Sequence, residues 1–424
     1  MGTFHRAFLQ AHATQNPPFL CYNSFIMTTK EISLCKNFHC LGPACPRNCC
    51  RGWHIPVDDA TVDRYKSLPG TEGRSVRSFL TRRRGLIVFR RIFGTCPFLN
   101  SDRLCQFQAN GAPELMPLVC RYYPREIITY SDYTEITLSL SCISAARLFV
   151  ERPERNAWAD APGAEPFWDV ANDDADFLAF LLKDREKIQD YIWREDLSLE
   201  QIWAGLYAYI AQEHAAIMRD RLEDLAEIEL EDGREESGSE KTAAAGTYEA
   251  GPAGDDGEGG RVGPAPNLAF FPITVLDRMI LNHIDYGMLL LREPKFASLI
   301  MKYNKLFKGL FVDTADEEFS NAVKRMMEKN PGFAKKYRAY FSYNIDQLYL
   351  KAYENYFVLR QFLFAILYTE LYMLFELVAS ETDGADGILS TERQAEILCL
   401  TETCVRHNPD LTQNLYNVIR QDFL

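Results

Sequence analysis

The distribution of cysteines is the feature that most restricts how this chain folds. Eight of its twelve cysteines lie between Cys40 and Cys142, and none lies from Ile143 to Leu398. Four of the eight fall within the short stretch FHCLGPACPRNCCRGW, where glycine and proline let the backbone turn back on itself. Thiols this close in sequence meet without closing a long loop, so we predict an N-terminal cysteine-rich domain.

Three explanations of the cluster differ in how well they fit. Disulfides suit small secreted scaffolds, whereas this chain is long, and adjacent cysteines such as Cys49 and Cys50 seldom pair with each other. Reduced core cysteines do not explain the density beside glycine and proline. Metal ligation explains both features, and the absence of a CxxC pair favours an iron–sulfur cluster over zinc, which stays the alternative. The predicted ligands are Cys40, Cys45, Cys49, Cys50, Cys96, Cys105, Cys120 and Cys142.

The later cysteines of this set lie in three separate local patterns. Cys96 in CPFL and Cys105 in RLCQF suggest a short hairpin with residues 100–102 at its turn. Cys120 opens the segment CRYYPR, and Cys142 ends the strand-like LSLSC before a helix. His39 and His54 flank the first motif, where we expect them to support the ligands more than to bind metal themselves.

The rest of the chain has helical periodicity, so the predicted fold is mainly α. We expect a cysteine-rich metal-binding domain with a short hairpin, then a helical domain interrupted by a disordered acidic insertion. The predicted boundaries are 1–30 for an N-terminal extension, 31–152 for the cysteine-rich domain, 153–230 for a helical segment, 231–266 for the acidic glycine-rich linker and 267–424 for the C-terminal helical domain.

Several helices are expected at defined positions. Ser198 and Gln201 form a capping-box pattern at the start of a helix that should run to about Leu230. Residues 361–379 are apolar but interrupted by Glu370 and Glu376, so we predict a buried amphipathic helix and no membrane span. The C-terminal helices are predicted near residues 274–291, 295–308, 317–328, 345–379, 391–407 and 411–422.

Charge is distributed unevenly along the chain. Residues 222–260 hold thirteen acidic and two basic residues, a net charge of −11, against −13 for the whole chain. The remainder is near neutral, which does not indicate a nucleic-acid partner. The basic cluster of Arg82, Arg83, Arg84, Arg90 and Arg91 is interpreted as a solvated helix end or loop, with an anion site as the alternative.

The N-terminal segment also bears on the compartment. Polar and histidine residues stand where a signal peptide needs a continuous apolar stretch, so we expect a cytoplasmic protein. Met27 is an equally acceptable start.

Five blocks, in this order, resemble the flagellin lysine N-methylase family (FliB-like). They are FxCxGxxCxxxCCxGWxI at residues 38–55, CPFL at 96–99, LC at 104–105, CRYYPR at 120–125 and LSLSCxxAARL at 138–148. A weaker likeness continues through the segments IQDYIWREDLSLEQIW and KAYENYF. The acidic insertion is peculiar to this chain.

The resemblance implies an enzyme that methylates surface lysines of flagellin, using S-adenosylmethionine and assisted by a [4Fe-4S] cluster on these cysteines. The residues alone give less support for methyl transfer. No GxGxxG fingerprint follows a strand, and the CxxxCxxC signature of radical S-adenosylmethionine enzymes is absent because Gly52 stands at its third position. The methyl donor would therefore bind in another way.

Candidate catalytic residues come from two segments. Arg121, Tyr122, Tyr123 and Arg125 would bind the donor carboxylate or a substrate carbonyl, with Arg121 and Arg125 as the donor-binding pair. Their alternative role is local packing around Pro124. Glu354 would hold or deprotonate a lysine ammonium, although an aromatic helix face such as residues 353–356 is more often core.

Two other classes of function remain open at this point. One is a non-enzymatic iron- or zinc-binding module with a helical docking domain, which would bind metal without consuming a methyl donor. The other is a redox protein, which the lack of a CxxC pair disfavours.

Overall fold

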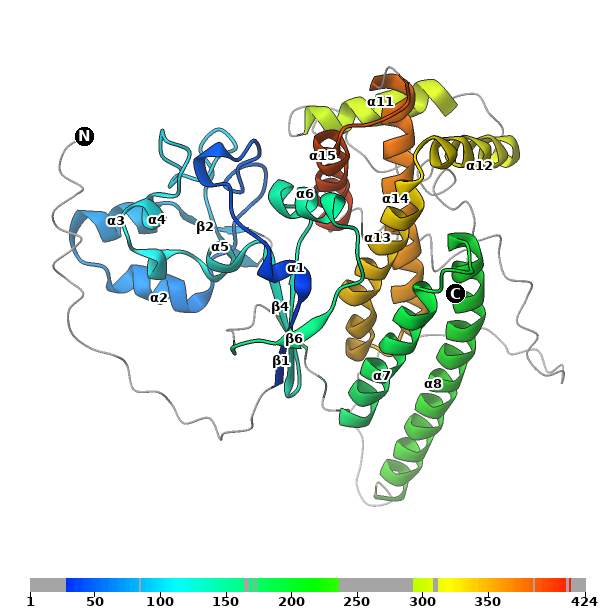
Figure 1. Cartoon of the computed structure of the whole chain (residues 1–424). Coiled ribbons are helices and arrows are strands. Elements are labelled where there is room, and N and C mark those ends of the chain that lie inside the picture. Colours follow the sequence, from blue (N-terminus) through cyan, green and yellow to red (C-terminus); the bar gives the residue numbers. More distant parts are fainter. Residues whose placement is uncertain are drawn as a thin grey trace.

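The computed structural model describes residues 28–83, 85–163, 168–170, 172, 174–235, 293–307, 312–383, 386–408 and 412. Helices dominate these residues, which confirms the mainly α prediction, and a small sheet accompanies them. A small N-terminal module lies at one end of the molecule, the sheet lies beside it, and the long helices lie on the other side (Figure 1). Of the acidic linker predicted at 231–266, residues 231–235 are helical and residues 236–266 fall outside the described residues. The helices predicted at 274–291 and 411–422 also fall almost entirely outside them, and the predicted domain boundaries stay predictions.

The five-stranded sheet joins strands from distant parts of the chain. Its strand order is β6-β1-β5-β4-β7, in which β1 runs parallel to β5 and β4 runs parallel to β7. Antiparallel pairing joins β4 to β5 and β1 to β6. The bounds are Thr28–Ile32 for β1, Arg125–Tyr130 for β4, Tyr133–Leu138 for β5, Trp158–Asp160 for β6 and Trp168–Val170 for β7.

The N-terminal module has its own small core. Its aromatic centre contains Phe98, whose ring centroid lies 4.5 Å from that of Phe107 and 4.9 Å from that of Phe89. The two-stranded hairpin β2 (Leu80–Arg83) and β3 (Leu86–Phe89) covers it, so the predicted solvated arginine loop is a β-hairpin. The short helices of this region are α1 (Ser33–Lys36), η1 (Gly42–Ala44), α2 (Asp59–Ser67), α3 (Gly70–Ser78), α4 (Gln106–Ala109), η2 (Pro113–Leu115) and α5 (Leu118–Tyr122).

The larger core includes both the sheet and the helices, from Ile32 on β1 to Val405 near the C-terminus. The helices that contribute to it are α6 (Ile143–Glu151), α7 (Ala175–Ile192), α8 (Leu199–Glu235), α11 (Pro294–Phe307), α12 (Val312–Lys329), α13 (Gly332–Leu348), η4 (Tyr349–Glu354), α14 (Val358–Asp383), α15 (Thr391–Thr401) and the π-helical turn η5 (Glu402–Arg406). Burial of apolar surface stabilises this part by about 25 cal/mol per Å².

Several helix predictions are confirmed, with revised bounds. The capping box forms, because Ser198 N donates to Gln201 Oε1 at 2.8 Å and Gln201 N donates to Ser198 Oγ at 3.3 Å. Helix α8 continues past the predicted end at Leu230 to Glu235. The predicted helices at 295–308, 317–328 and 391–407 correspond to α11, α12 and α15 with η5.

The long helix predicted over 345–379 is wrong in two respects. The chain is already helical from Gly332, and it breaks between η4 and α14, where Tyr356 has a φ of 63° that no helix accommodates. Helix α14 is apolar and long enough to cross a membrane by composition, yet it is the core helix of this structure and is buried on all sides instead of being amphipathic.

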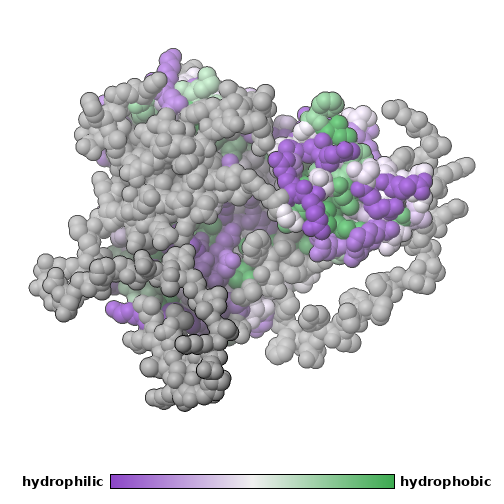
Figure 2. Space-filling view, turned by 180° about the vertical axis from the view of Figure 1, so that it is seen from behind, coloured by the Kyte–Doolittle hydropathy of each residue, from purple (hydrophilic) through white to green (hydrophobic). Residues whose placement is uncertain are grey.

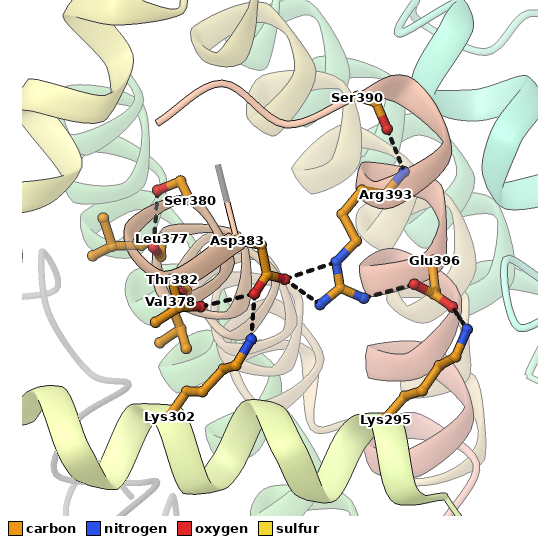
Figure 3. Close-up of polar contacts among 10 residues, drawn as sticks. All are labelled: Lys295, Lys302, Leu377, Val378, Ser380, Thr382, Asp383, Ser390, Arg393 and Glu396. Carbon is orange, nitrogen blue, oxygen red and sulfur yellow. Dashed lines mark hydrogen bonds and ion pairs between the residues drawn. The ribbon is translucent and has the colours of Figure 1, made fainter. Parts of the chain in front are cut away.

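An ion-pair network joins the ends of three of these helices (Figure 3). Arg393 on α15 donates to Asp383 at the end of α14 at 2.6 Å and to Glu396 at 2.6 Å. Lys302 and Lys295, both on α11, pair with Asp383 and Glu396. Because these groups are partly exposed, each pair contributes roughly 1 kcal/mol or less.

Candidate functional site

The eight predicted cysteine ligands fall into two neighbouring groups. Four of them, Cys50, Cys96, Cys105 and Cys120, border the small N-terminal core, with Cys49 next to them in sequence. Cys142 packs instead against the larger core, and Cys40 and Cys45 lie on either side of η1. Every cysteine among the described residues has a free thiol.

Backbone pairing brings the first group together. Cys96 N donates to Cys50 O at 2.8 Å, which places the first residue of the CPFL block against the CC pair. An antiparallel bridge joins Leu99 to Cys105, and Asn100 N donates to Leu104 O at 2.9 Å. This pairing is consistent with the predicted hairpin and carries Cys105 toward the same core.

The thiols of this group influence one another. Hydrogen bonding to Cys50 lowers the pKa of Cys49 to about 7 and lowers the pKa of Cys96 as well. Hydrogen bonds with Cys49 and Cys96 raise the pKa of Cys50 correspondingly. Burial raises the pKa of Cys105 and of Cys120, and the charges of Cys96 and Cys49 raise both pKa values further. A ligand needs a thiolate, which Cys49 reaches near neutral pH and which the lowered pKa of Cys96 also favours.

A formed metal site is not seen. Across the described part of the chain, no three histidine, cysteine, aspartate or glutamate side chains converge so as to hold one ion. The donor set nevertheless fits an iron–sulfur cluster in kind, because it consists of thiols that lie at the edge of an apolar core. The imidazole of the flanking His54 has another partner, since its Nε2 lies 2.7 Å from an Arg83 nitrogen, and the backbone carbonyl of His39 accepts a hydrogen bond from Ser144.

The segment CRYYPR lies between the two groups of thiols. It forms the end of α5 and the start of β4, joined by a cis peptide bond at Tyr123–Pro124. Burial raises the pKa of Tyr123, and Cys142, Cys399 and Cys49 are near enough to raise it further. Its ring lies 6.5 Å from that of Trp53, whose indole donates to Cys49 O at 2.7 Å.

The predicted catalytic residues do not form a single cluster. Arg125 donates to Cys35 O at 3.4 Å and lies 5.7 Å from the ring of Phe38, while Arg121 lies over the ring of Tyr122 at 5.9 Å. Both arrangements match the local packing alternative. Glu354 is exposed at the end of η4, on the side of Lys351.

A chain of hydrogen bonds leads from Tyr123 to the C-terminal turn η5. Tyr123 Oη lies 3.1 Å from Ser141 Oγ, which lies 2.9 Å from Ser139 Oγ. Ser139 Oγ in turn lies 2.9 Å from Nε2 of His407. Ser139 is 2% exposed, whereas the His407 side chain is 42% exposed. These hydrogen bonds therefore connect the hydroxyl of the half-buried Tyr123, near the thiols, to the exposed His407.

Charged groups surround His407, the solvent-exposed end of this series of hydrogen bonds. His407 Nε2 lies 3.7 Å from Glu126 Oε1 on β4. Burial alone would raise the pKa of Glu126, but His407, Arg406 and Lys351 outweigh it and lower that pKa. Burial lowers the pKa of Lys351, and Glu126 opposes this shift. Glu126 thus stays ionised, and its carboxylate faces Nε2 of His407.

Sequence reasoning missed Glu126, Ser139, Ser141 and His407. They are common residue types without a motif spacing, and only the pairing of β4 with β5 and the docking of η5 bring them together. The one signal was their position, since Ser139 and Ser141 belong to the LSLSC block and Glu126 follows CRYYPR.

Comparisons with known proteins give partial matches. The chain is 29% identical over 141 residues to proteins named Lysine-N-methylase from Salmonella choleraesuis (strain SC-B67) and Salmonella typhimurium (strain LT2), which is 32% of this chain and 35% of each relative. It is 29% identical over 138 residues to Flagellar biosynthetic protein FliU from Salmonella muenchen, which is 31% of this chain and 82% of that protein. No family model and no solved structure matches. The chain thus spans about a third of the length of the two lysine-N-methylases, and it is similar to them over that part.

Proposed function

We propose that this chain is a protein-lysine N-methyltransferase that uses S-adenosylmethionine and acts on flagellin or a similar protein in the cytoplasm. The observation that carries the proposal is the similarity to two proteins named Lysine-N-methylase. The name of the FliU relative, a flagellar biosynthetic protein, supports a flagellar substrate. The first group of cysteine thiols, which lies beside the CRYYPR segment, supports a metal-assisted site.

The cluster ligands proposed here are the thiols of the first group. Cys50, Cys96, Cys105 and Cys120 border one core, and Cys49 lies beside them with a pKa of about 7. Three of these thiols would hold an iron–sulfur cluster and leave one iron without a protein ligand, and that iron would act as a Lewis acid for the amino and carboxylate groups of the methyl donor. Cys40, Cys45 and Cys142 belong to the second group and are proposed to support the site rather than to bind the cluster.

Methyl transfer to lysine requires the removal of a proton. The neutral Nζ forms a bond to the methyl carbon, the carbon–sulfur bond of the donor breaks, and the electron pair stays on sulfur. The nitrogen then carries an extra positive charge and a proton that must leave. We propose that the hydroxyls of Tyr123, Ser141 and Ser139 pass this proton to Nε2 of His407, which is exposed to solvent and faces the ionised Glu126.

Removing the last hydroxyl before His407 tests the proton route. Ser139→Ala interrupts the link between Ser141 and His407, so kcat for lysine methylation is expected to fall about 10- to 100-fold with little change in KM. Ser139→Thr, which keeps the hydroxyl, should restore most of the rate.

The matched control is Ser380→Ala. Ser380 is a buried serine whose hydroxyl donates to Leu377 O inside α14, so it takes no part in the hydrogen bonds between Tyr123 and His407. Steady-state kinetics of the wild type, Ser139→Ala, Ser139→Thr and Ser380→Ala test whether the proton follows this route. A Ser139→Ala enzyme with wild-type kcat would rule out the route and leave the methyltransferase proposal intact.

A further inference from the structure

The exposed apolar side chains of the described residues are concentrated on the N-terminal module. Seven large apolar residues are exposed among the described residues, and four of them lie between residues 41 and 93, namely Leu41, Leu86, Ile92 and Phe93. Phe93 has an exposed fraction of 103%, so its whole ring is in water. Green apolar atoms lie among purple polar ones on the smaller lobe in the space-filling view (Figure 2).

Phe93 is held at the tip of a tight turn. Ile92 N donates to Thr95 O at 2.8 Å and Thr95 N donates to Ile92 O at 3.0 Å, which leaves Phe93 and Gly94 as the two turn residues. Their φ angles are 47° and 77°, a conformation that glycine and asparagine favour and that a bulky side chain rarely adopts. A phenylalanine at this position buries no surface in the fold and does not suit the positive φ of the turn.

The surroundings of this turn are strongly basic. Residues 73–101 contain seven arginines and no acidic residue, in a chain whose net charge is −13. Arg51 pairs with Thr95 across an antiparallel bridge and is exposed beside the turn. Arg83 and Arg91 both approach Nε2 of His54, at 2.7 and 3.2 Å. An apolar anchor surrounded by arginines is the composition of a protein-binding hot spot.

This surface lies directly beside the proposed cluster ligands. Cys50 precedes Arg51, and Cys96 follows Thr95, and the two cysteines are hydrogen bonded through their backbones at 2.8 Å. A protein docked on the turn would therefore bring its own side chains next to the first group of thiols.

We propose that the Phe93 turn and its arginines form the docking surface for the protein substrate, which would contact it with an apolar pocket rimmed by acidic residues. This rests on the proposed function, because the substrate is the protein whose lysines are methylated. Charge complementarity selects the partner: arginines predominate around the turn, and the carboxylate of Glu293 beside Gly52 is already paired with Arg47, so an acidic face gains attraction and a basic face is repelled. The buried phenylalanine then supplies affinity that salt does not screen.

Two substitutions test the docking surface in the full chain. Phe93→Ser removes the anchor and is expected to weaken binding of monomeric flagellin about 10- to 100-fold and to raise KM similarly while kcat is unchanged. Arg83→Glu reverses one rim charge and is expected to slow association and to reduce its salt dependence. Binding is measured by fluorescence anisotropy with labelled flagellin, without methyl donor, and kinetics are measured separately.

The matched controls are Ile388→Ser and Arg325→Glu, which change an exposed apolar residue and an exposed arginine on the helical side. Circular dichroism is used to check that all four variants are folded. Unchanged flagellin binding by Phe93→Ser overturns the proposal, as does wild-type protein that binds RNA or anionic vesicles but not flagellin. If wild-type protein binds flagellin through Phe93 but transfers no methyl group, the docking surface is supported and the proposed methyltransferase activity is wrong.

Discussion

Cys96→Ser is expected to lose the bound iron and sulfide and to reduce lysine methylation on the order of 100-fold or more. Cys96 is 6% exposed, is hydrogen bonded to Cys50 and borders the same core as Cys105 and Cys120. Replacing even a supporting partner of a metal ligand commonly costs about 10- to 100-fold, so loss of a ligand should cost at least as much. Iron, sulfide and the visible spectrum are measured on protein purified without oxygen.

Two other cysteine variants make this experiment specific. Cys35→Ser is the matched control, because Cys35 is a buried cysteine outside the predicted ligands whose thiol donates to Ile136 O at 3.8 Å. It should keep its iron and its activity. Cys142→Ser should also keep its iron, and if it loses as much as Cys96→Ser, the assignment of the ligands to the first group is wrong.

Lys336→Met is expected to lower the free energy of unfolding by about 3–5 kcal/mol. Lys336 on α13 is buried and donates to both carboxylate oxygens of Glu376 on α14, at 2.8 and 2.6 Å. Removing the lysine leaves a carboxylate in the core, where the hydroxyls of Tyr337 and Tyr372, each at 2.7 Å, do not neutralise its charge. Chemical denaturation monitored by circular dichroism gives the value.

The exposed lysine of the Figure 3 network provides the comparison. Lys295→Met removes a pair with Glu396 in which the lysine side chain is 65% exposed, and the expected loss is roughly 1 kcal/mol or less. The double variant Lys336→Met/Glu376→Leu should recover most of the lost stability, since no unpaired charge stays in the core. Equal losses for Lys336→Met and Lys295→Met would show that the α13–α14 pair is not buried in the folded protein.

Features encoded locally could be predicted from the sequence. The capping box at Ser198, the helix α11 and the start of α15 at Thr391 follow from residues that lie within one or two turns of each other. The cysteine-rich region was located by its composition, and the backbone bond between Cys96 and Cys50 brings two of its separate blocks together.

Features that depend on distant pairing could not be predicted. Strands β6 and β7 have three residues each, too few for an alternating pattern, and β1 pairs with β5 far along the chain. The break before α14 depends on the positive φ of Tyr356 within a continuous apolar pattern. For the same reason His407 was not proposed, because nothing in its local sequence indicates that it meets Ser139.

The most direct test of the account is a methylation assay on protein purified without oxygen. The chain is incubated with S-adenosylmethionine and monomeric flagellin, iron and zinc are quantified in the same preparation, and flagellin peptides are analysed by mass spectrometry. The account predicts methyl mass gains on surface lysines that require the donor, from a protein that contains iron and sulfide. Bound metal with no methylated lysine would contradict it, and would identify the chain as a metal-binding module.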